Sequence, residues 1–297
     1  MAEEKRPGDS NRITREYIDS LLVEMRHLDA AMPSTAFPLF GETFSTPVMT
    51  AALSHLQRLH PDGMVELARG AVKAGAVLWT GMGDESELAA ITATGAKTIK
   101  IIKPYADNED IYRKIRHAEE CGVIAVGIDV DHAFNRNGGY DIVHDRPMRP
   151  KSTAEIRDFA AATRLPFLIK GVLGVKDALK CVGAGVAGIV VSHHHGIMDF
   201  AVPPLMALPE IRKAVGGDYP LFVDCGLESG MDVFKALALG ATACSVGRAL
   251  MGPLGESGAD GVAKAIANIA AGLVHTMAMT ASPDLTHIDP SVIHRAQ

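Results

Sequence analysis

The chain has 297 residues, of which 47% are hydrophobic and 22% are charged, and its formal net charge at pH 7 is -6. This composition is typical of a globular protein, and the length suits one large α/β domain or two small ones. No run of like charge dominates the sequence, which argues against nucleic acid and anionic membranes as partners.

The N-terminal stretch and the cysteines indicate the compartment. MAEEKRPGDSNR is charged throughout and lacks the apolar region of a signal peptide. We expect roughly the first ten residues to be loosely ordered, and no apolar run looks long enough to cross a bilayer. The four cysteines lie in or beside apolar stretches and form no CxxC pair, which favours reduced thiols and a cytoplasmic location. They are Cys121, Cys181, Cys225 and Cys244.

Eight short apolar runs alternate with segments of helical periodicity. The runs are almost continuously hydrophobic, as expected of strands buried on both faces. They cover residues 47–53, 76–80, 98–103, 123–130, 166–171, 188–192, 220–224 and 243–247.

The helical segments between the runs support a closed α/β fold. Residues 62–74, 108–121 and 231–239 are predicted helices, and each is followed by a glycine, a common signal for a helix C-terminus. Strands that alternate with helices in this way favour a (β/α)8 TIM barrel formed by residues 46–297, with residues 1–45 as an N-terminal segment that packs on it. A doubly wound open sheet is the alternative, but the first strand is followed by MTAALSHLQ rather than a GxGxxG turn.

In such barrels the chemistry lies at the C-terminal ends of the strands. Lys170 ends an otherwise apolar run, and a buried ammonium group is costly unless it is paired, so we expect it to contact a ligand. The turns VDCGLESG and SVGRAL, after the last two strands, are of the kind whose backbone N–H groups hold phosphates, and Arg248 would add charge-assisted hydrogen bonds. The longest connection, 131–151, has the length of a lid over a substrate.

From about residue 46 to 279 the chain resembles the FMN-dependent α-hydroxy-acid oxidase and dehydrogenase family. The stretches that carry this resemblance are LPFLIKGVLGVKDALKCVGAGVAGIVVSHHHG, LPEI and DVFKALALGATACSVGR. The family typically shows KG(I/V)L, VSNHGGRQ, DGGIRxGxDVxKALALGA and GRP. The KALALGA stretch and its spacing to GR are the most specific of these matches.

The resemblance implies FMN as the cofactor and assigns roles to single residues. Lys170 matches the lysine at the pyrimidine edge of the flavin, where a cation stabilises negative charge in the reduced ring. His194 matches the base that removes the substrate hydroxyl proton, and Asp129 matches the aspartate that orients this base. The cofactor-binding set is completed by positions in the phosphate cradle and at the strand ends. These are Ala51, Ala52, Thr80, Lys100, Ser192, Asp224, Gly226, Gly247 and Arg248.

The chain departs from the family pattern mainly on the substrate side. The arginine that grips the substrate carboxylate is replaced by Ile197, the strand-three tyrosine by Ile102, and a phosphate-binding arginine by Glu228. Tyr17 does not convincingly match the family's early substrate tyrosine. Another cation must hold the carboxylate, or the substrate differs. The candidate substitutes are Arg136, His193, His195 and Lys100.

We therefore expect an FMN-dependent oxidoreductase that oxidises a small hydroxylated substrate by hydride transfer, contains no metal, and forms a homo-oligomer, which the resemblance suggests is a tetramer. Three alternatives stay open. One is a metal-dependent barrel hydrolase or lyase. Another is an FMN-binding protein that no longer oxidises, and the third is a Schiff-base aldolase using Lys170. The ligands of the metal-dependent alternative would be His193, His195, Asp129 or His132, and Asp224.

Overall fold

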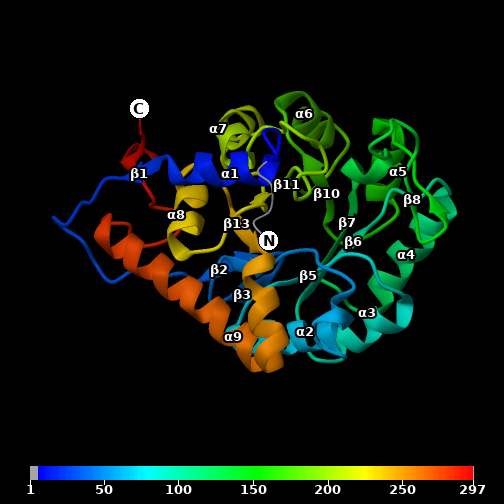
Figure 1. Cartoon of the computed structure of the whole chain (residues 1–297), viewed down its shortest axis with the longest axis horizontal. Coiled ribbons are helices and arrows are strands. Elements are labelled where there is room, and N and C mark those ends of the chain that lie inside the picture. The colour runs from blue at the N-terminus through cyan, green and yellow to red at the C-terminus, as the bar shows by residue number, and fades with distance from the viewer. Residues whose placement is uncertain (1–5, 297) are drawn as a thin grey trace.

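The computed structural model describes residues 6–296, and its centre is a barrel of eight parallel strands (Figure 1). The order around the sheet is β4-β13-β12-β11-β10-β7-β6-β5, which follows the chain around the barrel. The strands are β4 (Val48–Thr50), β5 (Leu78–Thr80), β6 (Thr98–Ile102), β7 (Ala125–Asp129), β10 (Phe167–Val172), β11 (Gly188–Val191), β12 (Leu221–Val223) and β13 (Ala243–Val246).

Thr50 closes the barrel between its first two strands. Its backbone N–H donates to Val77 O at 3.1 Å, and its hydroxyl accepts from the N–H of Trp79 at 2.8 Å. A parallel bridge between Leu53 and Thr80 continues this contact toward the C-terminal end. The sheet is therefore closed, which confirms the predicted (β/α)8 barrel and excludes the open doubly wound sheet.

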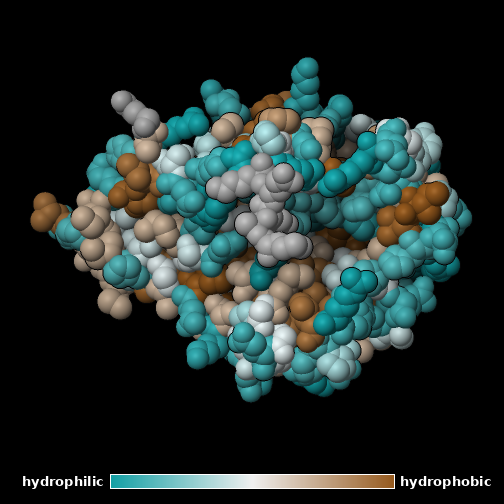
Figure 2. All heavy atoms as spheres, in the orientation of Figure 1, coloured by the Kyte–Doolittle hydropathy of each residue, from teal (hydrophilic) through white to brown (hydrophobic). Residues whose placement is uncertain are grey.

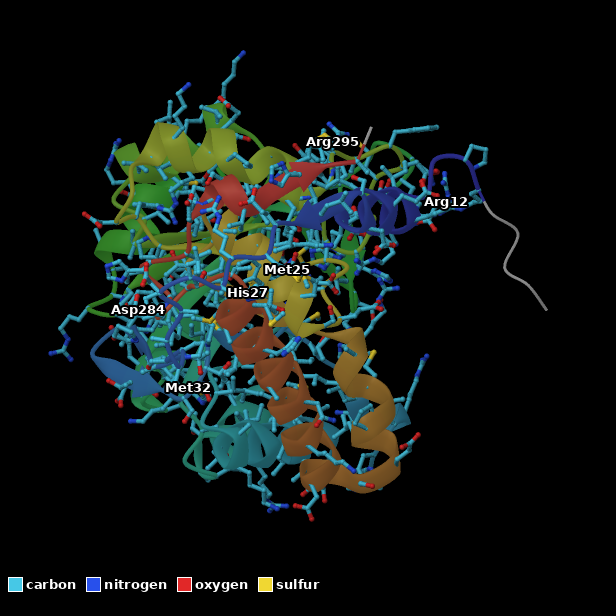
Figure 3. The ribbon with its side chains drawn as sticks, turned by 90° about the vertical axis from the view of Figure 1, so that its left-hand side faces the viewer. Arg12, Met25, His27, Met32, Asp284 and Arg295 are labelled. Carbon is cyan, nitrogen blue, oxygen red and sulfur yellow. The ribbon has the colours of Figure 1, made fainter. Side chains whose placement is uncertain are left out.

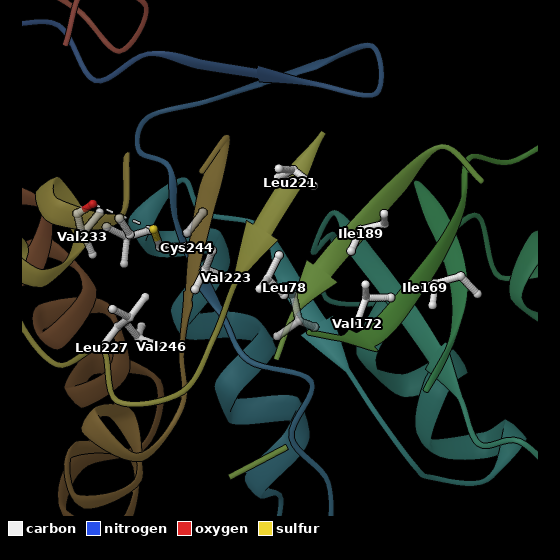
Figure 4. Packing of buried hydrophobic residues seen from close by; sticks show 14 of the residues in the cluster. Leu78, Ile169, Val172, Ile189, Leu221, Val223, Leu227, Val233, Cys244 and Val246 are labelled. Atoms are coloured by element: carbon white, nitrogen blue, oxygen red, sulfur yellow. Dashed lines mark hydrogen bonds between the residues drawn. The ribbon is translucent and has the colours of Figure 1, made fainter. Parts of the chain in front are cut away.

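Side chains alternate between the barrel interior and the helical layer, as the strand period of two requires. Trp79, Leu168 and Phe222 belong to the interior cluster. Residues of the opposite parity, such as Ile169 and Val223, pack in the outer cluster beneath the helices (Figure 4). The hairpin of β2 (Phe37–Leu39) and β3 (Glu42–Phe44) adds phenylalanines to the interior cluster, so the interior is filled with side chains up to the catalytic end.

The three predicted helices, at residues 62–74, 108–121 and 231–239, are present to within one residue at each end, and the described residues contain six further α-helices. Gly75, which follows α2, has φ +61°, the left-handed conformation expected after a helix. The helices are α1 (Ser10–Asp19), α2 (Gly63–Ala74), α3 (Glu85–Thr92), α4 (Asn108–Glu120), α5 (Thr153–Ala161), α6 (Val175–Gly183), α7 (Pro204–Val215), α8 (Gly230–Ala238) and α9 (Arg248–Met279).

Helix α9 has the length and apolar composition of a membrane-spanning helix, by these two criteria alone. Its backbone leaves the helical conformation at Ser257 and Gly258, so it consists of two arms (Figure 3). Val262, Ile266 and Leu273 are fully buried in the outer cluster. We therefore describe α9 as part of the barrel's outer layer.

The N-terminal segment is held to the barrel by secondary structure. Helix α1 begins at Ser10, and β1 (Leu21–Val23) pairs with β14 (Ile293–Arg295), so both ends of the chain share a small sheet. The expectation of a loosely ordered start applies largely to residues 1–5, which lie outside the described residues. The long connection after β7 contains a 3-10 turn (Val130–Ala133) and a short hairpin, β8 (Ile142–Val143) with β9 (Arg146–Pro147).

Candidate active site

Charged side chains from neighbouring strands meet at the C-terminal end of the barrel. Lys170 and Asp129 lie directly opposite each other in the pairing of β10 with β7. Asp224 follows β12, and His194 follows β11. Because both neighbouring strands end in charged residues that point inward, the apolar interior gives way to a compact ionic cluster at this end.

Lys170 is the centre of this cluster. Its side chain is 7% exposed, and its Nζ lies 3.6 Å from Asp129 Oδ1, 3.6 Å from Asp224 Oδ2 and 3.3 Å from Ser192 Oγ. Burial would lower the pKa of Lys170, but the two carboxylates outweigh it and raise the pKa well above its usual value. The ammonium group is therefore permanently charged. This argues against the Schiff-base aldolase, whose nucleophilic lysine needs a lowered pKa.

The imidazole of His194 is held by Asp131. Its Nδ1 lies 2.7 Å from Asp131 Oδ1 and 3.2 Å from Asp129 Oδ1. The predicted contact between His194 and Asp129 is therefore present, and Asp131 is a second, nearer carboxylate that the sequence did not assign. Burial and Lys170 lower the pKa of His194, but the two aspartates outweigh them and the net effect raises it.

Asp131 itself is buried against Gly171. A Cβ at Gly171 would lie 2.5 Å from Asp131 Cγ, and Gly171 has φ +98°, so a glycine at this position leaves room for the carboxylate. Asp131 Oδ2 has no hydrogen-bond partner within residues 6–296. Burial, with a further contribution from Asp129, raises the pKa of Asp131 to about 6. Asp131 and His194 are therefore a hydrogen-bonded pair in which the pKa of each group is raised.

Asp129 has different partners. Lys103, just beyond β6, donates to Asp129 Oδ2 at 2.7 Å, and Lys170 lies on the side of Oδ1. Burial raises the pKa of Asp129, but Lys170, His194 and Lys103 together hold it well below its ordinary value. Asp129 is consequently ionised at neutral pH. Sequence reasoning did not assign roles to Asp131 and Lys103, although both lie at the strand ends where a barrel places its site.

A cavity of about 360 Å³ extends from this cluster to the N-terminus of α9. Lys170 and His194 lie on its wall, and Gly247 and Arg248 begin the helix at its other side. Most of the predicted cofactor-binding residues share this wall with Lys170. They are Ala51, Ala52, Asp224, Gly226, Gly247 and Arg248, and Glu228 lines the same cavity.

Three of the predicted cofactor-binding residues do not face this cavity. Lys100 shares the parity of Ile102 and points into the helical layer, where it donates to Gly81 O and lies near Glu87. Burial lowers the pKa of Lys100 to about 8. Thr80 is fully buried on the outward-facing parity of β5. Both predictions are therefore corrected, and Lys100 is also excluded as a substitute for the missing carboxylate-binding arginine.

Ser192 and His193 hold the turn after β11 in place. Ser192 Oγ accepts from Lys170 and from the His194 backbone N–H, so it positions both residues. His193 Nδ1 accepts from the Gly196 N–H at 3.0 Å, which leaves Nε2 as the donor to Thr14 Oγ1 at 2.7 Å. The prediction that His193 contacts substrate is wrong, because both of its ring nitrogens are engaged with helix α1 and its own turn.

His195 and Arg136 lie on different cavities. His195 lines the 360 Å³ cavity, so its ring lies on the cofactor side rather than on the predicted substrate side. Burial, and to a lesser extent the positive charge of Arg248, lowers the pKa of His195. Arg136 lines a second cavity of about 740 Å³ beneath the long connection, together with Asp131 and Ile197.

Asp129, Asp131 and His194 are close enough together to hold a metal ion. However, the ammonium group of Lys170 lies 3.3 Å from His194 Nδ1 and 3.6 Å from Asp129, and it would repel a bound cation. His193 has no free nitrogen, and Asp224 pairs with Lys170. The arrangement therefore favours proton transfer by a histidine over metal-dependent hydrolysis.

Comparisons with known proteins agree with this geometry. A family model described as FMN-dependent dehydrogenase matches residues 3–154 and 141–295. The chain is 32% identical to a 4-hydroxymandelate oxidase from Amycolatopsis orientalis, over 77% of this chain and 74% of that protein. It is 31% identical to an L-lactate oxidase from Alicycliphilus denitrificans, over 87% of this chain and 81% of that protein.

Solved structures extend the similarity to the whole fold. A mandelate oxidase in complex with (S)-2-phenylpropionate superposes with a TM-score of 0.87 at 28% sequence identity, covering 99% of this chain and 91% of that chain. The family match, the curated relatives and the ionic cluster at the catalytic end of the barrel lead to the same assignment. The chain belongs to the FMN-dependent dehydrogenase family and is an FMN-dependent oxidoreductase.

Proposed function

We propose that this protein oxidises a 2-hydroxy acid with FMN as the electron acceptor and His194 as the base. The observation that carries the proposal is the His194–Asp131 pair beside Lys170, in which His194 lines the smaller cavity and Asp131 lines the larger one. The relatives reported above carry the names of oxidases of mandelate-like and lactate-like hydroxy acids.

The residues around the smaller cavity fit FMN. Lys170 provides a fixed positive charge for the electron-accepting ring. At the other side, helix α9 begins at Gly247 without a side-chain cap, so its first N–H groups and Arg248 are suited to a phosphate. A Cβ at Gly247 would lie 3.2 Å from the Ala51 Cβ and would narrow the cavity. FMN held by these residues would supply the acceptor for a hydride and its two electrons from the hydroxyl-bearing carbon, which would become a carbonyl carbon.

Hydrogen bonds to Nδ1 define the state in which His194 acts as a base. Asp131 Oδ1 lies 2.7 Å from Nδ1 and accepts its proton, while Lys170 Nζ lies farther away, 3.3 Å from the same nitrogen and 3.3 Å from Ser192 Oγ, to which it donates. The lone pair of a neutral imidazole is then on Nε2, which can accept the substrate hydroxyl proton. The ionised Asp131 stabilises the imidazolium that results.

We further propose that Arg136 binds the substrate carboxylate. It lines the larger cavity with Asp131, and Ile197, which replaces the family's carboxylate-binding arginine, lines the same cavity. Ile197, Met198 and Phe134 make an apolar wall in the same cavity, which suits a substrate with an apolar side chain. The volume of about 740 Å³ lies within the range of small-molecule sites.

Anaerobic reduction of the purified protein tests the function. We expect a yellow protein whose flavin absorbance bleaches with a 2-hydroxy acid, and whose His194→Ala variant keeps FMN but no longer bleaches. His287→Ala removes an exposed imidazole paired with Asp284 and serves as the matched control, with unchanged bleaching. Bleaching that persists in His194→Ala would remove His194 from its role. FMN that no 2-hydroxy acid or alcohol bleaches would instead support the binding protein without oxidase activity.

Two broader properties are also proposals. We propose a cytoplasmic location, which the four free cysteines support. We also propose a homo-oligomer, because the segment after β1 projects from the barrel with apolar side chains at its tip (Figures 1 and 2). Leu28 is 90% and Met32 is 88% exposed there. Light scattering on the wild type and on Leu28→Ser/Met32→Ser checks this proposal, and a wild-type monomer would refute it.

A further inference from the structure

Asp129 is a buried carboxylate that contacts two lysines as well as the base, with its Oδ1 3.2 Å from His194 Nδ1. Its side chain is 4% exposed and lies between two lysines, with Lys103 Nζ at 2.7 Å and Lys170 Nζ at 3.6 Å. Burying a carboxylate among apolar strands is costly, and the cost is tolerated only where cations offset it. Because two lysines keep Asp129 ionised, we ask what effect its negative charge has on the site.

The carboxylates offset the positive charge of the lysines beside the smaller cavity. Lys170 and Lys103 carry two positive charges, and Asp129 and Asp224 carry two negative charges, so these four groups sum to zero. Each carboxylate lies 3.6 Å from Lys170 Nζ, which is close enough to offset most of its field. A neutral cluster stabilises additional negative charge in the cavity less well than an isolated ammonium group would.

The strand register of β7 and β10 places Asp129 directly beside Lys170. The two residues are Cα partners in the pairing of β7 with β10, and both project into the barrel. Lys103 follows Ile99 and Ile101 on the inward parity of β6 and reaches the other oxygen of the same carboxylate. Asp129 therefore accepts a hydrogen bond from Lys103 on one oxygen and forms an ion pair with Lys170 through the other, so it cannot turn away from Lys170 without breaking a contact.

We propose that Asp129 lowers the reduction potential of the bound FMN by offsetting the charge of Lys170, and that Lys103 holds Asp129 in place. This inference rests on the proposed function, because it places the flavin ring beside Lys170. A lower potential makes the oxidised cofactor a weaker electron acceptor toward substrate. It also makes the reduced cofactor a stronger donor toward the final acceptor.

The test is a charge cycle on the FMN-loaded protein with the variants Asp129→Asn, Lys103→Met and the double variant. Two measurements need no turnover: the potential by equilibration with a reference dye, and the affinity for sulfite by bleaching of the flavin band. Asp129→Asn removes a negative charge, so we expect sulfite to bind at least about tenfold more tightly. A tenfold shift of the two-electron equilibrium corresponds to about 30 mV upward.

An electrostatic effect should shift the sulfite affinity in opposite directions in the two single variants, whereas structural damage has no reason to do so. Lys103→Met removes a positive charge and should weaken sulfite binding, while the double variant should return toward the wild-type value. Asp284→Asn is the matched control, because Asp284 pairs with the exposed His287 and lines neither cavity, and it should leave the potential unchanged. An unchanged or lower potential in Asp129→Asn would overturn the inference, as would a rise in Lys103→Met.

The outcomes also distinguish this inference from the proposed function. A protein that binds no FMN refutes both. A protein that binds FMN and is reduced by a 2-hydroxy acid, but shows no shift in Asp129→Asn, refutes only the inference. The predicted shifts in a protein that no 2-hydroxy acid reduces support the inference and refute the function.

Discussion

Replacing Asp131 by asparagine should weaken His194 as a base in a way that a pH profile can identify. The change removes the carboxylate 2.7 Å from Nδ1 and leaves a neutral amide of the same shape. Hydrogen bonds to charged groups contribute roughly 1.5–3 kcal/mol, and the imidazolium forms only as the reaction proceeds. At about 1.4 kcal/mol per factor of ten, kcat/KM should fall about 10- to 150-fold.

The same substitution should move the acid limb of the kcat/KM profile. His194 acts as a base only when it is neutral, so activity rises as the pH increases through the pKa of the His194–Asp131 pair. Asp131 raises the pKa of His194, so Asp131→Asn lowers that pKa and the limb moves to lower pH. Disruption of the fold would lower the plateau without this shift.

Asp129→Asn is the comparison that can refute the assignment. Asp129 Oδ1 lies 3.2 Å from Nδ1, farther than Asp131, and Asp129 also accepts a hydrogen bond from Lys103 and forms an ion pair with Lys170. We expect its plateau to fall less than that of Asp131→Asn. If Asp129→Asn causes the larger loss of kcat/KM, then Asp129 is the partner of the base and the reasoning from the two distances fails.

Three further substitutions test the site around this pair. Gly171→Ala should lower the steady-state rate, because a Cβ there would displace Asp131. It should also lower the free energy of unfolding, measured by thermal unfolding, because φ +98° disfavours alanine. His193→Phe should destabilise the protein by about 1–3 kcal/mol in denaturant unfolding, because Thr14 loses its partner, while KM stays unchanged. Arg136→Leu should raise KM for a 2-hydroxy acid at least about tenfold in steady-state assays and leave FMN affinity unchanged.

The barrel could be predicted from the sequence because its eight strands are apolar throughout, but the same property hid the direction of each side chain. Lys100 and Lys103 lie on one short strand segment with apolar neighbours on both sides. When only one face of a strand is buried, the alternation of apolar and polar residues in the sequence shows which side chains face the core. A strand buried on both faces has no such alternation. Only the coordinates show that Ile99 and Ile101 face inward, which places Lys103 in the site and Lys100 beneath helices α3 and α4.

The choice between Asp129 and Asp131 could not be read from the pattern for a related reason. Strand β7 ends at Asp129, and a 3-10 turn begins at Val130, so the alternation of a strand no longer applies to Asp131. The turn brings Asp131 back toward the barrel, where Gly171 of the neighbouring strand leaves space for it. The signal in the sequence was the pair of aspartates two residues apart, and long-range packing decided between them.

For the three consecutive histidines, too, strand alternation fails because they lie beyond the end of β11. Strand alternation predicts His193 and His195 on one side, but His194 and His195 adopt the left-handed conformation with φ +49° and +54°. This conformation costs roughly 1–2 kcal/mol per non-glycine residue. It persists because Ser192 Oγ accepts the His194 N–H and His193 Nδ1 accepts the Gly196 N–H, which fixes the turn from both ends. Glycine at position 194 would relieve the strain but would remove the imidazole that the turn presents to Asp131, so the strain is retained where the chemistry requires it.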